Sequence, residues 1–167
     1  MQIILSTPTI INEFRYNNSS FETFHSQCQV NNIDYTFARS VKQSDYRHSL
    51  VTVNGTAIGL GEDPRAFDLS GTPACYAVHY NHQDQFVPQL YLQDGDEWIC
   101  INMQMPQDLK PGKNWSPFVY NDEVYFVHEV APFRVLKLNG DQLTTEFTHT
   151  IDSASMPIDN YSVLRGG

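Results

Sequence analysis

The stretch GLGEDPRAF, Gly59 to Phe67, gathers Glu62, Asp63 and Arg65 on one short segment of a chain that is otherwise poor in charge. Two adjacent carboxyl groups can raise the pKa of one of them, as a proton donor at neutral pH requires, and a guanidinium can hold an anion with two hydrogen bonds. The competing interpretation is a solvated turn closed by a local ion pair, which contributes well under ~1 kcal/mol. The residues alone favour the turn, so the surrounding elements must decide.

Short runs rich in β-branched and aromatic residues dominate the chain and predict β-strands of about five to eight residues. No segment has a convincing helical period of 3.6 residues. Gly, Asn and Asp between the runs tolerate the positive φ of tight hairpin turns. The fold class is therefore predicted to be all-β and mostly antiparallel. The predicted strands are 34–38, 49–53, 74–80, 89–93, 97–103, 123–130 and 133–138, and the predicted turns lie at 54–55, 70–71, 94–96, 121–122 and 139–141.

The composition limits the partners. A chain of 167 residues is long enough for one domain with a core, and its net charge of −9 makes nucleic acid an improbable partner. The abundant aromatic residues, 10 Phe, 9 Tyr and 2 Trp, fit a sugar-binding protein as well as many others. The three cysteines, Cys28, Cys75 and Cys100, form no CxxC pair and are expected to be free thiols, so no metal site is indicated. The start lacks the features of a signal peptide and no run is long enough to span a bilayer, which favours a soluble, cytoplasmic protein.

Two stretches of the sequence look alike. GEDPRAFDLSGTPACYAV begins at Gly61 and GKNWSPFVYNDEVYFVHEV begins at Gly112, 51 positions later, with Phe67 and Phe118 each six places on. This spacing is close to the period of about 40–50 residues of a β-propeller blade. One unit would then be four strands, with the innermost strand entered from a functional loop. The alternative is a chance similarity between two hairpins of a β-sandwich.

The motifs GLGEDPRAF, KNWSPF followed by a YFVH strand, FRVL and a final LRGG occur in this order between Arg39 and Gly167. Together they resemble the five-bladed β-propeller proteins related to glycoside phosphorylases and hydrolases that act on β-mannosides. The eukaryotic and viral glycosyltransferase-like relatives of that group are more similar still. The resemblance implies that EDPR and KNWSPF are equivalent loops on adjacent blades, both facing one pocket that binds an oligosaccharide or glycan.

The resemblance also implies roles in that pocket. Asp63 would be the general acid that protonates the glycosidic oxygen, and Glu62 would tune it or bind a sugar hydroxyl. Arg65 would restrain the carboxylates or bind an anion. No organic cofactor is implied, although inorganic phosphate is a candidate co-substrate.

Further pocket residues are implied by the neighbouring motifs. Lys113 and Asn114 would hold hydroxyls or phosphate, and Trp115 would offer an apolar platform for a sugar ring. His128 would be a further polar contact, and Arg165 the matching contribution of a third blade. The alternatives are a core position for Trp115 and a structural histidine at His128.

The chain departs from the family in its length. Five blades of roughly 50 residues need about 250, so the chain is expected to form one partial propeller domain of about three blades. Residues 1–43 match weakly, as an N-terminal blade or loop, and 44–167 carry the motifs. The polar segment 17–32 is expected to be a loop outside a blade.

Three explanations for the short chain stay open. It is a fragment, a second copy or chain completes the ring, or it is a shortened, non-catalytic remnant. The functional alternatives are a glycosidase, phosphorylase or glycosyltransferase, a carbohydrate-binding or scaffold protein without chemistry, and a plain interaction domain.

Overall fold

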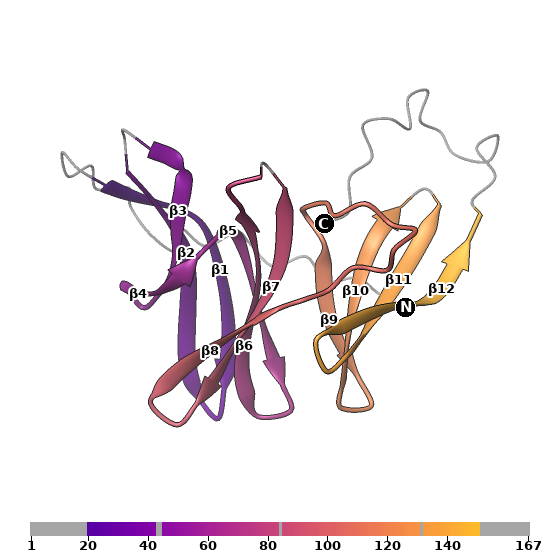
Figure 1. Ribbon diagram of the computed structural model, residues 1–167. Helices are drawn as coiled ribbons and strands as arrows, with labels where there is room; N and C mark the ends of the chain where they lie inside the picture. The colour runs from indigo at the N-terminus through magenta and orange to yellow at the C-terminus, as the bar shows by residue number, and fades with distance from the viewer. Residues whose placement is uncertain (1–19, 43–44, 84, 131, 151–167) are drawn as a thin grey trace, which may run out of the picture.

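The computed structural model describes residues 20–42, 45–83, 85–130 and 132–150 of the chain (Figure 1). These residues form twelve β-strands in three four-stranded antiparallel sheets, which confirms the prediction of an all-β fold. Sheet 1 contains β1 (Ser20–Val30), β2 (Ile33–Lys42), β3 (Asp45–Val53) and β4 (Thr56–Leu60). Sheet 2 contains β5 (Glu62–Leu69), β6 (Thr72–Tyr80), β7 (Phe86–Asp94) and β8 (Glu97–Asn102). Sheet 3 contains β9 (Ser116–Tyr120), β10 (Glu123–Val130), β11 (Phe133–Asn139) and β12 (Gln142–His149).

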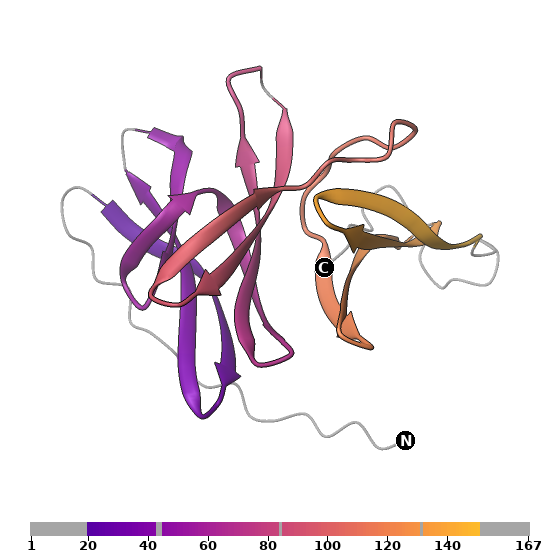
Figure 2. The same ribbon diagram turned by 60° about the horizontal axis from the view of Figure 1, so that its bottom comes forward.

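Each sheet is a simple up-and-down meander in which neighbouring strands follow one another along the chain. The sheets stand side by side in chain order, as both views show (Figures 1 and 2). The first strand of each sheet lies nearest to its counterparts, because β5 contacts both β1 and β9. The four-stranded unit expected from the repeat is therefore confirmed, and the described residues form three blade-like sheets.

Five of the six tight hairpin turns within the described ranges lie where the sequence predicts them, and the sixth, Asn31-Asn32 between β1 and β2, was not predicted. In every sheet, tight turns join the first strand to the second and the third to the fourth. Positive φ values at these turns explain the choice of Asn, Asp and Gly, which tolerate this conformation. Examples are Asn54 (48°) with Gly55 (84°), and Asn121 (50°) with Asp122 (61°).

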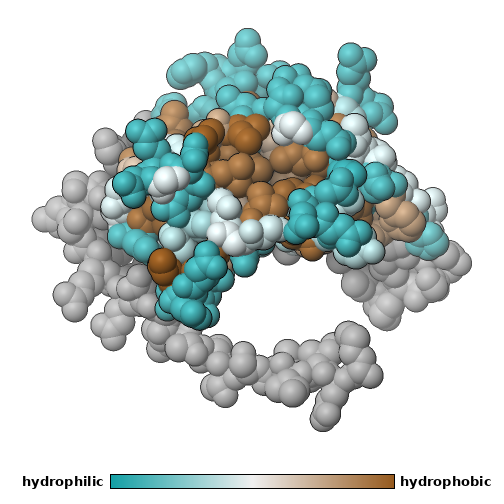
Figure 3. All heavy atoms as spheres, turned by 90° about the horizontal axis from the view of Figure 1, so that it is seen from below, coloured by the Kyte–Doolittle hydropathy of each residue, from teal (hydrophilic) through white to brown (hydrophobic). Residues whose placement is uncertain are grey.

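Sheet 2 is buried on both faces, and its central strand β6 shows why the sheets stack. Ala74, Tyr76 and Val78 point toward sheet 3, where they join a core with Trp115, Val124, Phe126 and Leu136. The alternate residues Cys75 and Ala77 point toward sheet 1 and join a second core with Phe37, Val51 and Val53. A strand with both faces buried reads as a continuous apolar run, as ACYAV does. Viewed from the hairpin end, apolar residues gather in the middle of the molecule between hydrophilic ones (Figure 3).

The first strands of the three sheets are built alike at one position. In each, a residue pairs with the second strand, and the residue two places before it has a positive φ. The pairs are Ser26 with Phe37, Arg65 with Tyr76, and Ser116 with Val127, and the positive-φ residues are Phe24 (52°), Asp63 (52°) and Asn114 (68°). The 51-residue repeat of the sequence is therefore a repeat of local backbone structure, and sheet 1 carries a third copy.

Two expectations from the sequence are wrong. The polar segment 17–32 is not an outer loop where the structure describes it, since Ser20–Val30 forms β1, which lies against β5. EDPR is not a loop before a strand either, because Glu62 to Arg65 already belong to β5. The pairing register shifts between Glu62 and Arg65. Such a bulge bends the strand and points a side chain in a direction that it would not have in a regular strand.

Candidate functional site

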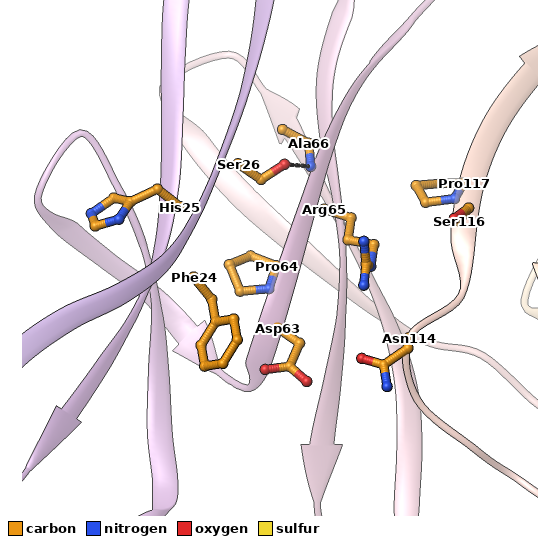
Figure 4. Close-up of a pocket in the computed structure, with 10 residues that line it drawn as sticks. All are labelled: Phe24, His25, Ser26, Asp63, Pro64, Arg65, Ala66, Asn114, Ser116 and Pro117. Carbon is orange, nitrogen blue, oxygen red and sulfur yellow. Dashed lines mark hydrogen bonds between the residues drawn. The ribbon is translucent and has the colours of Figure 1, made fainter. Parts of the chain in front are cut away.

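A cavity of about 360 Å³ lies at the start of the three first strands (Figure 4). All three sheets, or the segment leading into them, contribute residues to its wall. The lining residues are Phe24, His25 and Ser26 from β1, Asp63, Pro64, Arg65 and Ala66 from β5, Asn114 from the segment before β9, and Ser116 and Pro117 from the start of β9. The cavity is at the lower end of the volume range of ligand sites, about 300–1,000 Å³.

The repeated positive-φ position brings three different side chains to one space. Phe24, Asp63 and Asn114 occupy equivalent backbone positions, and Figure 4 shows their side chains on the same side of the cavity. A positive φ is acceptable for Asp and Asn but unusual for a bulky residue such as Phe. The Phe24 side chain is nevertheless 59% exposed, so burial in the core does not explain its conformation. Backbone strain of this kind clusters at ligand sites.

Asp63 belongs to a group of four charged side chains beside the cavity, whose other members are Glu62, Arg39 and Lys113. The Arg39 guanidinium lies 2.9 Å from the Glu62 carboxylate and 3.6 Å from that of Asp63. The Lys113 ammonium lies 3.5 Å from Glu62 and 4.0 Å from Asp63. The two positive charges balance the two negative ones, and because the members come from β2, β5 and the segment before β9, the group also links the three sheets.

Two polar atoms at the cavity lack hydrogen-bond partners among the described residues. Oδ1 of Asp63 is buried and accepts no hydrogen bond, although Arg39 lies 3.6 Å away. Nε of Arg65 is buried and donates none. An unsatisfied buried polar atom is uncommon and costs about 1–3 kcal/mol. One buried acceptor and one buried donor are thus unsatisfied on adjacent parts of the same wall.

The comparison of the two sheet interfaces explains why Arg65 is available. Between sheets 1 and 2, Ser26 Oγ accepts a hydrogen bond of 2.8 Å from the backbone N–H of Ala66. Between sheets 2 and 3, Arg65 takes the place of Ser26 and Pro117 the place of Ala66. Proline has no N–H, so no backbone donor needs an acceptor there, and Arg65, whose guanidinium can only donate, extends along the cavity wall (Figure 4).

The structure brings together five of the eight residues that the sequence nominates. Glu62, Asp63, Arg65, Lys113 and Asn114 all lie at the cavity or in the charged group beside it.

Trp115 and His128 lie elsewhere, and Arg165 falls outside the described residues. The Trp115 side chain is 1% exposed, and its ring stacks on Tyr76 with 5.5 Å between the centroids. The His128 ring packs 4.9 Å from the Trp115 ring, and burial lowers its pKa. The described position of Trp115 is in the core, so its indole faces are covered and do not line the cavity.

Sequence reasoning missed Phe24 and Arg39. Phe24 belongs to the segment expected to be a loop, and nothing in ETFHS marks a bulge. The sequence did contain a signal that β1 is a strand, because the Asn31-Asn32 pair that follows it forms a hairpin turn. Its φ values of 51° and 64° are similar to those of the turn at Asn121-Asp122. Arg39 directly follows the predicted strand 34–38, and only the sheet packing places its guanidinium beside Glu62.

Two features that would suggest other functions do not occur among the described residues. These residues include no group of three or more His, Cys, Asp or Glu residues placed to hold a metal ion. Within the same ranges there is no helix long and apolar enough to cross a membrane.

Comparison with known proteins gives no relative. No family model, no curated protein and no solved structure matches this chain. The resemblance to propeller enzymes therefore rests on the motifs alone, and the function has to be inferred from the geometry of the site.

Proposed function

We propose that the cavity at the start of β1, β5 and β9 binds a carbohydrate. The observation that supports this most directly is the pair of unsatisfied atoms, Asp63 Oδ1 and Arg65 Nε, beside an exposed aromatic ring. A sugar hydroxyl both donates and accepts hydrogen bonds, so it matches an acceptor and a donor on one wall. The amide of Asn114 adds a second polar group of both kinds.

Phe24 supplies the apolar part of the site. The ring lines the cavity, and the Arg39 guanidinium carbon lies 6.0 Å from its centroid. A sugar ring has an apolar C–H face, and covering that face and the exposed Phe24 ring removes apolar surface from water. Phe24 therefore takes the platform role for which the sequence nominates Trp115.

The contacts favour binding over catalysis. Arg39 and Lys113 both lie within ion-pair distance of Asp63, so the residue nominated as the acid belongs to a charged group that links the three sheets. A carboxylate oxygen of Asp63 can accept a hydrogen bond from a sugar hydroxyl without any proton transfer. The second candidate function, glycosyl transfer, hydrolysis or phosphorolysis with Asp63 as the acid, has in its favour the adjacent carboxylate of Glu62, which shares both cations.

Isothermal titration of the full chain with manno-oligosaccharides, with and without inorganic phosphate, tests the proposal. Asp63→Asn is the central variant because Asn tolerates positive φ, as the equivalent Asn114 shows. A hydrogen bond to a charged group contributes about 1.5–3 kcal/mol, so Asp63→Asn should weaken binding tenfold or more. Phe24→Asn, which also tolerates the backbone, should weaken it at least threefold.

Phe147→Asn is the matched control for Phe24→Asn. Phe147 is 49% exposed on β12 and does not line the cavity, so its substitution should leave binding unchanged. Absence of saccharide binding by the wild-type chain would leave a plain interaction domain as the remaining interpretation.

The same variants separate binding from catalysis. Product formation by the wild-type chain, measured as released reducing sugar or sugar phosphate and abolished by Asp63→Asn, would establish the second candidate. Binding without turnover, lost in the same variant, is the result that the charged group predicts.

A further inference from the structure

Arg65 is a cation on the cavity wall that lacks a carboxylate partner. The ion pairs of four other cations measure 2.7–3.5 Å: Arg39 and Lys113 with Glu62, Arg134 with Glu129, and Lys137 with Glu123. Arg65 forms no such pair with any residue that the structure describes, although its side chain is half-buried and its Nε atom is buried. The guanidinium has five N–H donors, so a single sugar hydroxyl would leave most of them unsatisfied. The position therefore suits a ligand that brings its own negative charge.

A second donor beside Arg65 is also unsatisfied. Tyr76 pairs directly with Arg65 across β5 and β6, so the two side chains share one face of sheet 2. The Tyr76 hydroxyl is buried without a hydrogen-bond partner in the described part of the chain, and burial raises its pKa, so it keeps its proton at neutral pH. Two unsatisfied donors thus lie near one unsatisfied acceptor, Oδ1 of Asp63. A carboxylate accepts hydrogen bonds and donates none, so it matches this excess of donors.

The charges at the cavity favour a ligand with one negative charge. The group of four charged side chains that contains Asp63 has two positive and two negative members, and Arg65 adds one positive charge. A phosphate monoester carries a charge of about −1.5 to −2 at pH 7, and its second charge would face the carboxylates of Glu62 and Asp63. A sugar carboxylate carries one charge, and its two oxygens fit the planar guanidinium with two parallel hydrogen bonds.

The direction of the Arg65 side chain agrees with this assignment. Figure 4 shows it extending toward the space between Asp63 and Asn114. General electrostatic attraction would not bring an acidic sugar to this chain, because a net charge of −9 repels anions. A preference for an acidic sugar therefore has to come from local contacts, and Arg65 supplies the charge for them.

We propose that the saccharide bound in this cavity is acidic, and that the carboxylate of one of its uronic acid units binds the guanidinium of Arg65. This inference rests on the proposed carbohydrate function and names the class of sugar. In this arrangement Arg65 selects the acidic unit, Asp63 and Asn114 hydrogen-bond its hydroxyls, and Phe24 covers a C–H face of the ring.

Isothermal titration of the full chain with three β-1,4-linked saccharides of equal length tests this assignment. Oligomannuronate, its methyl ester and the manno-oligosaccharide differ only at C6, which is a carboxylate, a neutral ester or a hydroxymethyl group. The wild-type chain should bind oligomannuronate at least tenfold more tightly than the other two. Arg65→Gln, which keeps an N–H donor but no charge, should remove this preference and change the binding of the manno-oligosaccharide less than threefold. Arg65→Lys keeps the charge and should retain a preference of at least threefold, and melting curves show whether both variants are folded.

Lys110→Gln is the matched control, because Lys110 is exposed, carries the same charge and does not line the cavity. Its preference for oligomannuronate should stay within threefold of that of the wild type. Equal affinity of the wild-type chain for oligomannuronate and its methyl ester overturns the acidic assignment and leaves the carbohydrate proposal standing, as does a preference that survives Arg65→Gln. Absence of binding to all three saccharides overturns both proposals.

Discussion

Replacement of Trp115 by alanine tests whether this residue belongs to the core or to the ligand site. The indole is 1% exposed and contacts three rings, with centroid distances of 5.5 Å to Tyr76, 6.0 Å to Phe126 and 4.9 Å to His128. Truncation of a buried aromatic side chain to alanine costs about 3–5 kcal/mol, to which each lost aromatic pair contributes about 0.5–1.5 kcal/mol. Because Trp115 joins sheet 2 to sheet 3, we expect the upper part of this range.

Urea unfolding followed by far-ultraviolet circular dichroism measures this loss without relying on tryptophan fluorescence. A domain of ordinary stability, about 5–15 kcal/mol, would lose a third or more of its free energy of unfolding. Tyr120→Ala is the control, since its side chain is 63% exposed and its removal should cost less than about 1 kcal/mol. A loss below 1 kcal/mol for Trp115→Ala, with an unchanged denaturant slope, would refute the core position and return the platform role to this residue.

Three further predictions concern packing, pH and thiol chemistry. A Cβ at Gly59 would lie 2.6 and 2.8 Å from Cε1 and Cζ of Tyr91, so Gly59→Ala should destabilise the protein by about 1–3 kcal/mol, seen as a lower melting temperature; an unchanged value would contradict the tight contact. Burial lowers the pKa of His128 below its ordinary 6.5. The unfolded state therefore takes up more protons than the folded state. The contribution of His128 to the free energy of unfolding should be fully present above about pH 6.5 and should decrease as the pH falls below it. His128→Phe should reduce this pH dependence in urea titrations at pH 5.5 and 7.5. Cys100 is exposed and Cys75 is buried with a raised pKa, so iodoacetamide should label Cys100 in the native protein and Cys75 only on unfolding, and mass spectrometry that finds native Cys75 labelled would argue against the packing of β6.

The sequence predicted seven of the twelve strands, those whose signals are local, and did not predict β1, β4, β5, β9 and β12. The runs 74–80 and 123–130 became β6 and β10, and the turn at Asn54-Gly55 follows from the backbone freedom of those two residues. β1 was missed because its side chains, in SFETFHSQCQV, are largely polar. Its place beside β5 comes from packing of a few residues such as Cys28 against the second core, and a short apolar minority gives no clear alternation.

The site was predicted in part, and the reason is the same. Asp63 and Asn114 were found because a repeated motif marks them, and both residues have a positive φ two places before a residue, Arg65 or Ser116, that pairs with the next strand. Arg39 and Phe24 were missed because their role depends on which sheets touch. Trp115 was assigned to the pocket because it belongs to the KNWSPF motif, yet its side chain packs in the core with Tyr76 and Phe126.

The recurrence of one backbone bend at Phe24, Asp63 and Asn114 has a consequence for how such a protein can change. An aromatic, an acidic and an amide side chain occupy equivalent backbone positions in the three sheets. This backbone conformation thus accepts side chains of very different chemistry. A new specificity can therefore arise by exchanging one of these residues at a time, which makes this trio the natural starting point for redesigning or tracing the divergence of the molecule.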